Sequence, residues 1–162
     1  MVSIRLKQLV DEVFQDYMKP SMLLATCQCD WKCCYESNID ISVCQNSELA
    51  QQPDIDVTFK TIVERYINNP LTQAIVIAGL EPMLQFNEVN GFVKYFRQYC
   101  KDDIVIYTGY YPIELNHELK TLQEYKNIII KFGRFIPNRP SKYDCVLGVN
   151  LSSDNQYAQI IS

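Results

Sequence analysis

Four cysteines stand within eight residues of this chain, at positions 27, 29, 33 and 34, and a fifth follows at position 44. The chain has seven cysteines in all, an odd number, and its N-terminus has no apolar segment typical of an export signal. A disulfide framework is therefore not expected. In a reducing compartment, thiols gathered in one short loop are typical of a metal site, and soft, charged thiolates are the ligands that bind iron–sulfur clusters.

Two alternatives remain for this segment. Structural zinc prefers four ligands, often supplied by paired Cys-x-x-Cys motifs, and the chain has no such motif. The cysteines could also be reduced, buried side chains without a metal. An iron–sulfur cluster held by three cysteines differs from both, because it leaves one iron free for a small molecule.

The overall composition limits the other functions. The chain has 162 residues, of which 48% are apolar and 21% charged, enough to close the core of one domain. A net charge of -4 gives no basic field for nucleic acid or anionic lipid. The longest apolar runs, such as Ile104–Tyr107, are far shorter than the roughly 20 residues of a membrane span. We expect a cytoplasmic protein.

The elements that must position the cysteines follow from hydrophobic periodicity. Apolar residues at helical spacing predict a helix over 3–18 that ends at Pro20. Further helices are predicted at 59–67, at 89–96 with Asn87 as N-cap, and at 115–125. Buried strands are predicted at 21–26, 74–78, 104–108 and 127–131, with two more at 145–148 and 157–161. Residues 27–57 are predicted to be a long loop.

Apolar strands that alternate with helices predict an α/β fold with a parallel β-sheet of repeated β–α units, covered by helices on both faces. We expect an open, partial TIM-like barrel and a single domain over 1–162, with an N-terminal helix at 1–20 and a cysteine loop with an insertion at 27–57. In such sheets the ligand site lies beyond the carboxyl ends of the strands. The cysteine loop and two Gly-containing segments, at 79–82 and 108–110, all follow strands.

The segment from Pro20 to Cys33 resembles the first strand and Cys-x-x-x-Cys-x-x-Cys loop of radical S-adenosylmethionine (AdoMet) proteins. Cys29 and Cys33 match the first two cysteines, but the third position is Glu36. Cys44, followed by Gln45-Asn46, resembles the third cysteine of the family's activase branch, and Cys34 is the alternative. The resemblance thus implies a [4Fe–4S] cluster on Cys29, Cys33 and Cys44, with Cys34 in reserve, whereas Cys27 is expected to pack at the end of the strand.

The segments after the later strands extend the resemblance. Gly79-Leu80-Glu81-Pro82 resembles the Gly-Gly-Glu-Pro turn that binds the amino group of AdoMet, with Leu80 in place of the second glycine. Tyr107-Thr108-Gly109-Tyr110 and Gly133-Arg134-Phe135 resemble segments of the activases of anaerobic ribonucleotide reductase, as does Asn155-Gln156. The AdoMet-binding residues implied are Trp31, Gly79, Glu81, Tyr107, Thr108, Arg134 and Asn155. His117, the only histidine, is expected at the surface.

This resemblance implies an enzyme whose reduced cluster cleaves AdoMet to methionine and a 5′-deoxyadenosyl radical. The radical would install a glycyl radical on a partner such as anaerobic ribonucleotide reductase, with flavodoxin or ferredoxin as electron donor. Two rival expectations remain: a radical AdoMet enzyme that modifies another protein, peptide or small molecule, and a non-enzymatic zinc or iron–sulfur binding module.

Overall fold

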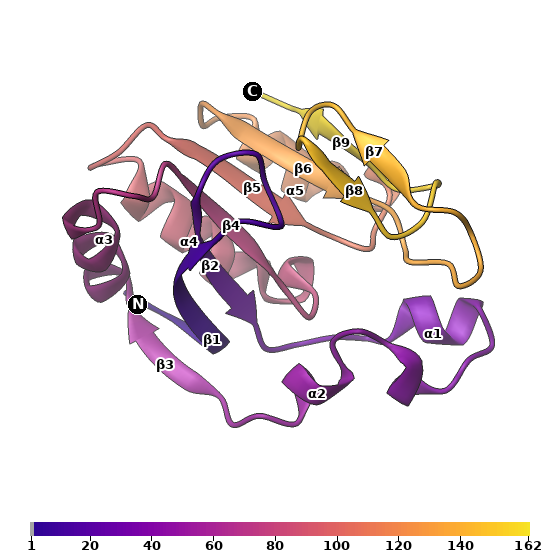
Figure 1. Ribbon diagram of the computed structural model, residues 1–162. Coiled ribbons are helices and arrows are strands. Elements are labelled where there is room, and N and C mark those ends of the chain that lie inside the picture. The colour runs from indigo at the N-terminus through magenta and orange to yellow at the C-terminus, as the bar shows by residue number, and fades with distance from the viewer. Residues whose placement is uncertain (1) are drawn as a thin grey trace.

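A mixed seven-stranded β-sheet runs through the computed structural model, which describes residues 2–162 (Figure 1). Its strand order is β3-β1-β2-β4-β5-β6-β9. Strands β2 (Ser21–Thr26), β4 (Ala74–Gly79), β5 (Asp103–Tyr107) and β6 (Ile128–Phe132) are parallel to one another. Strands β1 (Ser3–Val13), β3 (Ile55–Thr58) and β9 (Tyr157–Ile160) pair antiparallel. The strands predicted at 21–26, 74–78, 104–108, 127–131 and 157–161 are thereby confirmed within a residue or two at their ends.

The predicted parallel, TIM-like barrel is wrong. Strand β1 turns back antiparallel onto β2, and β9 lies antiparallel to β6, so the parallel order stops on both sides. Strands β3 and β9 are the two edges of an open sheet. The physical reason is the connections. A short connection without a helix joins β1 to β2, and the chain between β6 and β9 also contains no helix, whereas a barrel needs a helical crossover after every strand.

The predicted N-terminal helix is also wrong, because these residues form strand β1; the first residue of the predicted 1–20 range lies outside the described residues. The pairing of β1 with β2 has two register irregularities, one between Leu6 and Gln8 and one between Val10 and Val13. An irregularity of this kind interrupts the alternation of inward-facing and outward-facing side chains along a strand. The spacing of Leu6, Leu9, Val10 and Val13 therefore imitates a helix.

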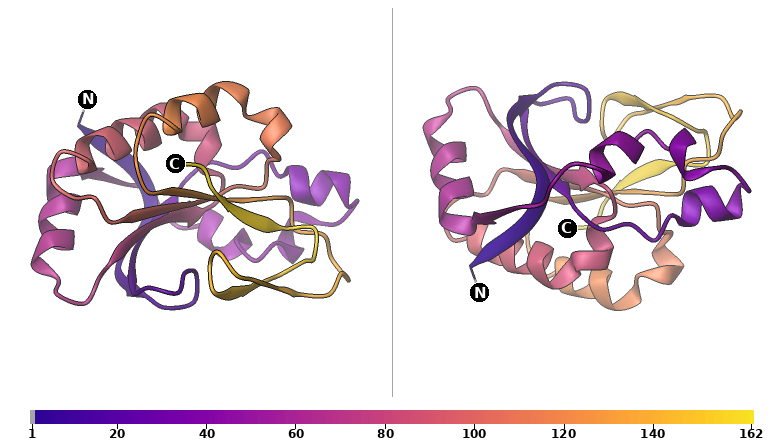
Figure 2. Two further views of the ribbon diagram at one scale, coloured as in Figure 1. Left: turned by 90° about the horizontal axis from the view of Figure 1, so that it is seen from above. Right: turned by 90° about the horizontal axis from the view of Figure 1, so that it is seen from below.

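Helices cover only one face of the sheet, not both as predicted. Figure 2 shows α3 (Phe59–Asn68), α4 (Phe86–Phe96) and α5 (Asn116–Leu122) together on that face. The three helices predicted here are confirmed, although the N-cap of α4 is Gln85 rather than Asn87. The 3-10 turn Pro82–Gln85 leads directly into α4 and shifts its start. Fully buried Phe92 and Phe96 from α4 pack onto sheet residues such as Ile75, Ile104 and Ile130.

The second face is covered by the connection between β1 and β2 and by a hairpin of β7 (Lys142–Asp144) and β8 (Val149–Leu151) (Figure 2). The strand predicted at 145–148 is instead the turn of this hairpin. The carboxylate of Asp144 accepts hydrogen bonds from the backbone N–H groups of Val146 and Leu147, which favours a turn. Its second oxygen accepts the N–H of Ala158 and ties the hairpin to β9.

The cysteine segment is not one long loop. It contains the short helices α1 (Lys32–Glu36) and α2 (Ser47–Ala50) and the 3-10 turn Ile41–Val43, and it ends in β3. A further 3-10 turn, Pro112–Glu114, precedes α5. None of the helices within residues 2–162 has the length and apolar character to cross a membrane.

Candidate metal centre

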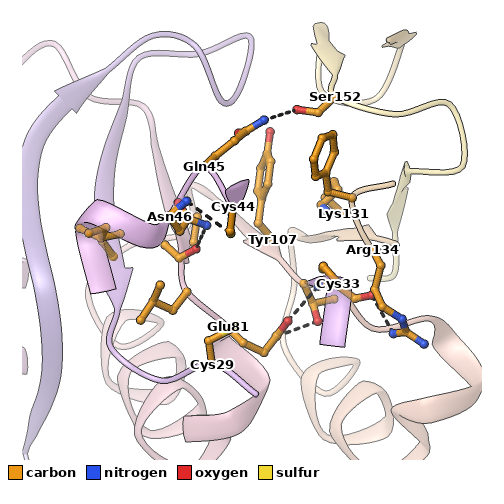
Figure 3. Close-up of a pocket in the computed structure, with 18 of the residues that line it drawn as sticks. Cys29, Cys33, Cys44, Gln45, Asn46, Glu81, Tyr107, Lys131, Arg134 and Ser152 are labelled. Carbon is orange, nitrogen blue, oxygen red and sulfur yellow. Dashed lines mark hydrogen bonds between the residues drawn. The ribbon is translucent and has the colours of Figure 1, made fainter. Parts of the chain in front are cut away.

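The cysteine segment closes over a pocket at the carboxyl ends of the parallel strands. The pocket has a volume of about 560 Å³, within the usual range for small-molecule sites. Its walls come from the ends of β2, β4, β5 and β6, from the hairpin residues Asn150–Ser152, and from residues 29–52 of the cysteine segment. The pocket lies at the edge of the sheet where the topology of parallel strands predicts a ligand site. Figure 3 shows Cys29, Cys33 and Cys44 among the residues that surround it.

Cys29 and Cys33 are brought together by a sharp reversal of the backbone. Trp31, between them, has a left-handed backbone with φ of 59°, rare for a residue other than glycine, and α1 starts directly after it. This turn lets the backbone N–H of Trp31 donate to the Sγ of Cys29 at 3.3 Å. The backbone of Phe135, in the segment after β6, lies near Cys33 and partly offsets the rise of the Cys33 pKa that burial causes.

Cys44 reaches the pocket through the insertion that follows α1. Its Sγ accepts the backbone N–H of Asn46 at 3.4 Å, and the Asn46 side chain donates to the carbonyl oxygen of Gly79 at 2.6 Å. Asn46 thus fixes Cys44 to the end of β4. Gly79 has φ of 89°, and a Cβ there would lie 2.8 Å from backbone atoms of Ala25 and Thr26. Only glycine fits this close approach of two strands.

The other cysteines differ in position. Cys34 is 1% exposed and lines the pocket, where burial and the neighbouring Cys44 raise its pKa. Cys27 lies outside the pocket, where the Gln85 side chain accepts from both its backbone N–H and its thiol, as expected for a packing residue. Glu36, at the position of the third cysteine in the radical AdoMet motif, pairs with Arg134 and does not line the pocket.

The thiols of the pocket fit a cationic centre. Burial raises the pKa of Cys29 to about 12 and also raises the pKa of Cys33. Without a cation both thiols stay protonated at neutral pH, and a bound metal displaces the protons. Between residues 2 and 162, no three His, Cys, Asp or Glu side chains converge closely enough to hold a single ion.

Glu81 is a buried carboxylate that joins the ends of β4 and β5. One of its oxygens accepts the N–H of Met83 and the hydroxyl of Thr108, and the other accepts the N–H of Gly109 at 2.9 Å. Burial raises the pKa of Glu81, while these hydrogen bonds oppose the shift. Glu81 and Thr108 both line the pocket, but their polar atoms are largely occupied with each other and with the backbone.

Arg134 is likewise occupied by protein groups, and so is the side-chain nitrogen of Asn155, whereas the buried Oδ1 of Asn155 has no hydrogen-bond partner among the described residues. Arg134 forms ion pairs with Glu36 and Glu114 and also donates to the carbonyl of Gly109. These contacts raise the pKa of Arg134, chiefly through the hydrogen bond to Glu114. Asn155 donates to the Arg134 carbonyl and to the Tyr111 hydroxyl. Of the seven residues predicted to bind AdoMet, all but Asn155 line the pocket.

Three residues of the pocket were missed in the sequence. Lys131 is 6% exposed and lies on β6, Asp16 comes from the connection between β1 and β2, and Gln45 donates to Ser152 across the mouth of the pocket (Figure 3). Lys131 could have been found from the sequence, because a lysine directly after Ile128-Ile129-Ile130 in a buried strand is unusual and indicates a functional role. No local pattern marks the other two. His117 is exposed, as expected.

Comparison with known families gives one match. The family model described as the 4Fe-4S single cluster domain matches residues 18–157, most of the chain. The chain belongs to this family. Its cofactor is therefore an iron–sulfur cluster, in agreement with the prediction from the cysteine segment. No curated protein matches the chain.

The match corrects the assignment to radical AdoMet activases, because the family found is that of a 4Fe-4S single cluster domain. The resemblance rested on a cysteine loop and on Gly-containing turns after parallel strands. A sheet that holds a cluster at its carboxyl edge needs both features, whatever reaction it supports. Short motifs of this kind therefore indicate the cluster more securely than the reaction.

Proposed function

We propose that this protein is an iron–sulfur binding module in which three cysteines hold one [4Fe–4S] cluster and the fourth iron faces the pocket. One observation carries the proposal. Cys29, Cys33 and Cys44 all line the same pocket, and the sulfurs of Cys29 and Cys44 each accept a hydrogen bond from the backbone. Such hydrogen bonds to sulfur are one of the means by which proteins tune a cluster.

Cys44 is the proposed third ligand in preference to Cys34. Adjacent residues rarely direct both side chains into one small cage, and Cys34 directly follows Cys33. Asn46 also fixes Cys44 against β4 through both its backbone and its side chain. Cys34 also lines the pocket and stays the alternative ligand.

A bound cluster supplies one-electron transfer and a Lewis-acidic iron. The chain's own residues supply the rest. The hydrogen bond from Gln45 to Ser152 links the cysteine segment to the β7–β8 hairpin across the pocket. Glu81 keeps the ends of β4 and β5 at a fixed separation beneath the pocket. Seven free thiols favour a reducing compartment, so we propose the cytoplasm.

The proposal is tested by anaerobic reconstitution of the full chain with iron and sulfide. We expect about four irons per chain and a broad visible absorbance in the wild type. Cys44→Ala should lose both, whereas Cys34→Ala and Cys145→Ala, a change of an exposed thiol far along the chain, should retain them. A colourless wild type that binds one zinc would refute the proposal. If only Cys34→Ala loses the cluster, Cys34 and not Cys44 is the third ligand.

A second candidate function is reductive cleavage of AdoMet at the open iron. It is favoured by one observation, that six of the residues predicted to bind AdoMet line the pocket. Against it stand the protein contacts that occupy Glu81 and Arg134. In this case the chain would be an enzyme that receives electrons from a flavodoxin or ferredoxin and acts on a partner such as a glycyl-radical enzyme. Formation of 5′-deoxyadenosine by the reduced, cluster-loaded protein would support this candidate. If no 5′-deoxyadenosine forms, only the binding-module function stays proposed.

A further inference from the structure

The pocket extends beyond the cysteines onto the sheet face that the helices leave uncovered. Lys131 pairs with Tyr107 across β5 and β6, and its side chain lies on the same face as Ile129, two residues before it. On the neighbouring strands this face carries Ala25 and Ala78, which also line the pocket. Because these side chains are small, they leave room in front of the lysine.

Lys131 is a buried cation with few protein partners. Only 6% of the residue is exposed. Among residues 2–162, its Nζ forms one hydrogen bond, to the carbonyl of Gly133 at 3.1 Å, and no ion pair. An ammonium group has three donors, so the remaining hydrogen-bonding capacity has no protein acceptor. The ring of Tyr107, with its centre 5.5 Å from Nζ, forms the adjacent wall.

Among residues 2–162 no carboxylate forms an ion pair with Lys131. Burial lowers the pKa of Lys131 to about 8, and the nearby Glu81 opposes that shift. The oxygens of Glu81 already accept hydrogen bonds from Met83, Thr108 and Gly109. A buried charge is costly unless it is paired, and a cavity-lining cation is therefore suited to an anion that enters the cavity.

The wall beside Lys131 is rigid and aromatic. The hydroxyl of Tyr107 donates to the carbonyl of Asp16 at 2.6 Å, which fixes the ring against the connection between β1 and β2. An aromatic face next to an ammonium group fits a ligand that joins an apolar or ring-shaped body to an acidic group.

From this geometry we propose that Lys131 binds the carboxylate or phosphate group of a small molecule that occupies the pocket, with Tyr107 against the body of that molecule. This inference deepens the proposed function and rests on it, since the same pocket would face the open iron. It assigns the pocket to small anionic molecules and gives Lys131 the role of the residue that selects them.

The test compares three simple probes, namely benzoate, phenyl phosphate and the neutral benzyl alcohol, by isothermal titration calorimetry at constant ionic strength. The full chain is used, loaded with its cluster under nitrogen. We expect the wild type to bind at least one anionic probe ten or more times more tightly than benzyl alcohol. The two anionic probes separate a carboxylate ligand from a phosphate ligand.

Two variants and one control make the test specific. Lys131→Met removes the charge, and Lys131→Gln keeps a donor for the Gly133 carbonyl in case the methionine variant fails to fold. Both should lose the preference for the anionic probes. Lys142→Met changes an exposed lysine on β7 and should preserve it. The proposal is overturned if the wild type shows no preference, or if a folded Lys131 variant retains it.

The same titration of the metal-free chain separates this inference from the proposed function. A protein that loads no iron but prefers the anionic probes through Lys131 would refute the cluster assignment and keep the anion site. A protein that loads about four irons without any such preference would keep the cluster and refute the anion site.

Discussion

Replacement of Gly79 by alanine should destabilise the protein strongly, because this residue lies where the end of β4 meets the end of β2. Its backbone has φ of 89°, and an added Cβ would lie 2.8 Å from both the Cα of Ala25 and the amide nitrogen of Thr26. These are backbone atoms of a buried strand, so they cannot rotate away as the end of a side chain would. The strands must separate or the turn must change its conformation.

The size of the effect follows from two costs. The left-handed backbone costs a residue with a Cβ about 1–2 kcal/mol. Overpacking of a well-packed contact costs about 1–3 kcal/mol. Together they predict a loss of roughly 2–5 kcal/mol, a large part of the roughly 5–15 kcal/mol by which domains are usually stable.

The free energy of unfolding should be measured by urea denaturation of the reduced, metal-free chain, followed by circular dichroism. Gly91→Ala is the matched control. Gly91 lies in α4 with an ordinary backbone, and its Cβ would meet only the ring of Phe59 at 3.3 Å. There a gain in helix propensity of about 1 kcal/mol offsets the crowding. If Gly79→Ala costs less than about 1 kcal/mol, the reasoning from close approach is wrong.

Three further predictions concern the groups that support the pocket. Glu114→Gln should lower the free energy of unfolding by about 1 kcal/mol at pH 7, the scale of an exposed ion pair. The hydrogen bond from Arg134 lowers the pKa of Glu114 to about 2. The difference in stability between variant and wild type should therefore vanish as the pH falls from 4.5 to 2, which acid-unfolding curves would measure. Asp144→Ala leaves three backbone N–H groups without their acceptor and should cost about 1–3 kcal/mol in urea denaturation, whereas equal stability would contradict its role. Glu81→Gln places an amide donor against the N–H of Gly109, and we expect a cluster that forms but is lost faster in air, measured by the decay of its visible absorbance.

Local sequence was sufficient to predict the helices and strands whose formation depends mainly on residues close to one another along the chain. The run Ala74–Ala78 is apolar at every position and is buried on both sides, so it forms a strand in any arrangement of the helices. In α3, buried Phe59, Ile62, Val63 and Tyr66 recur at helical spacing and the helix forms as predicted. The carboxyl edge of the parallel strands was also predictable, because strands joined by helical crossovers end on the same side.

The sequence by itself determined that this protein gathers thiols beside the ends of parallel strands, because residue type and order along a strand are local properties. Tertiary structure alone decided the rest. The antiparallel return of β1 depends on pairing with β2 and β3, and irregular pairing hides its alternation. The attachment of Asn46, beside Cys44, to Gly79, the occupation of Arg134 by two glutamates and the burial of Lys131 all depend on residues far apart in the chain. Hydrophobic periodicity cannot predict such contacts, since they arise only when distant segments pack together.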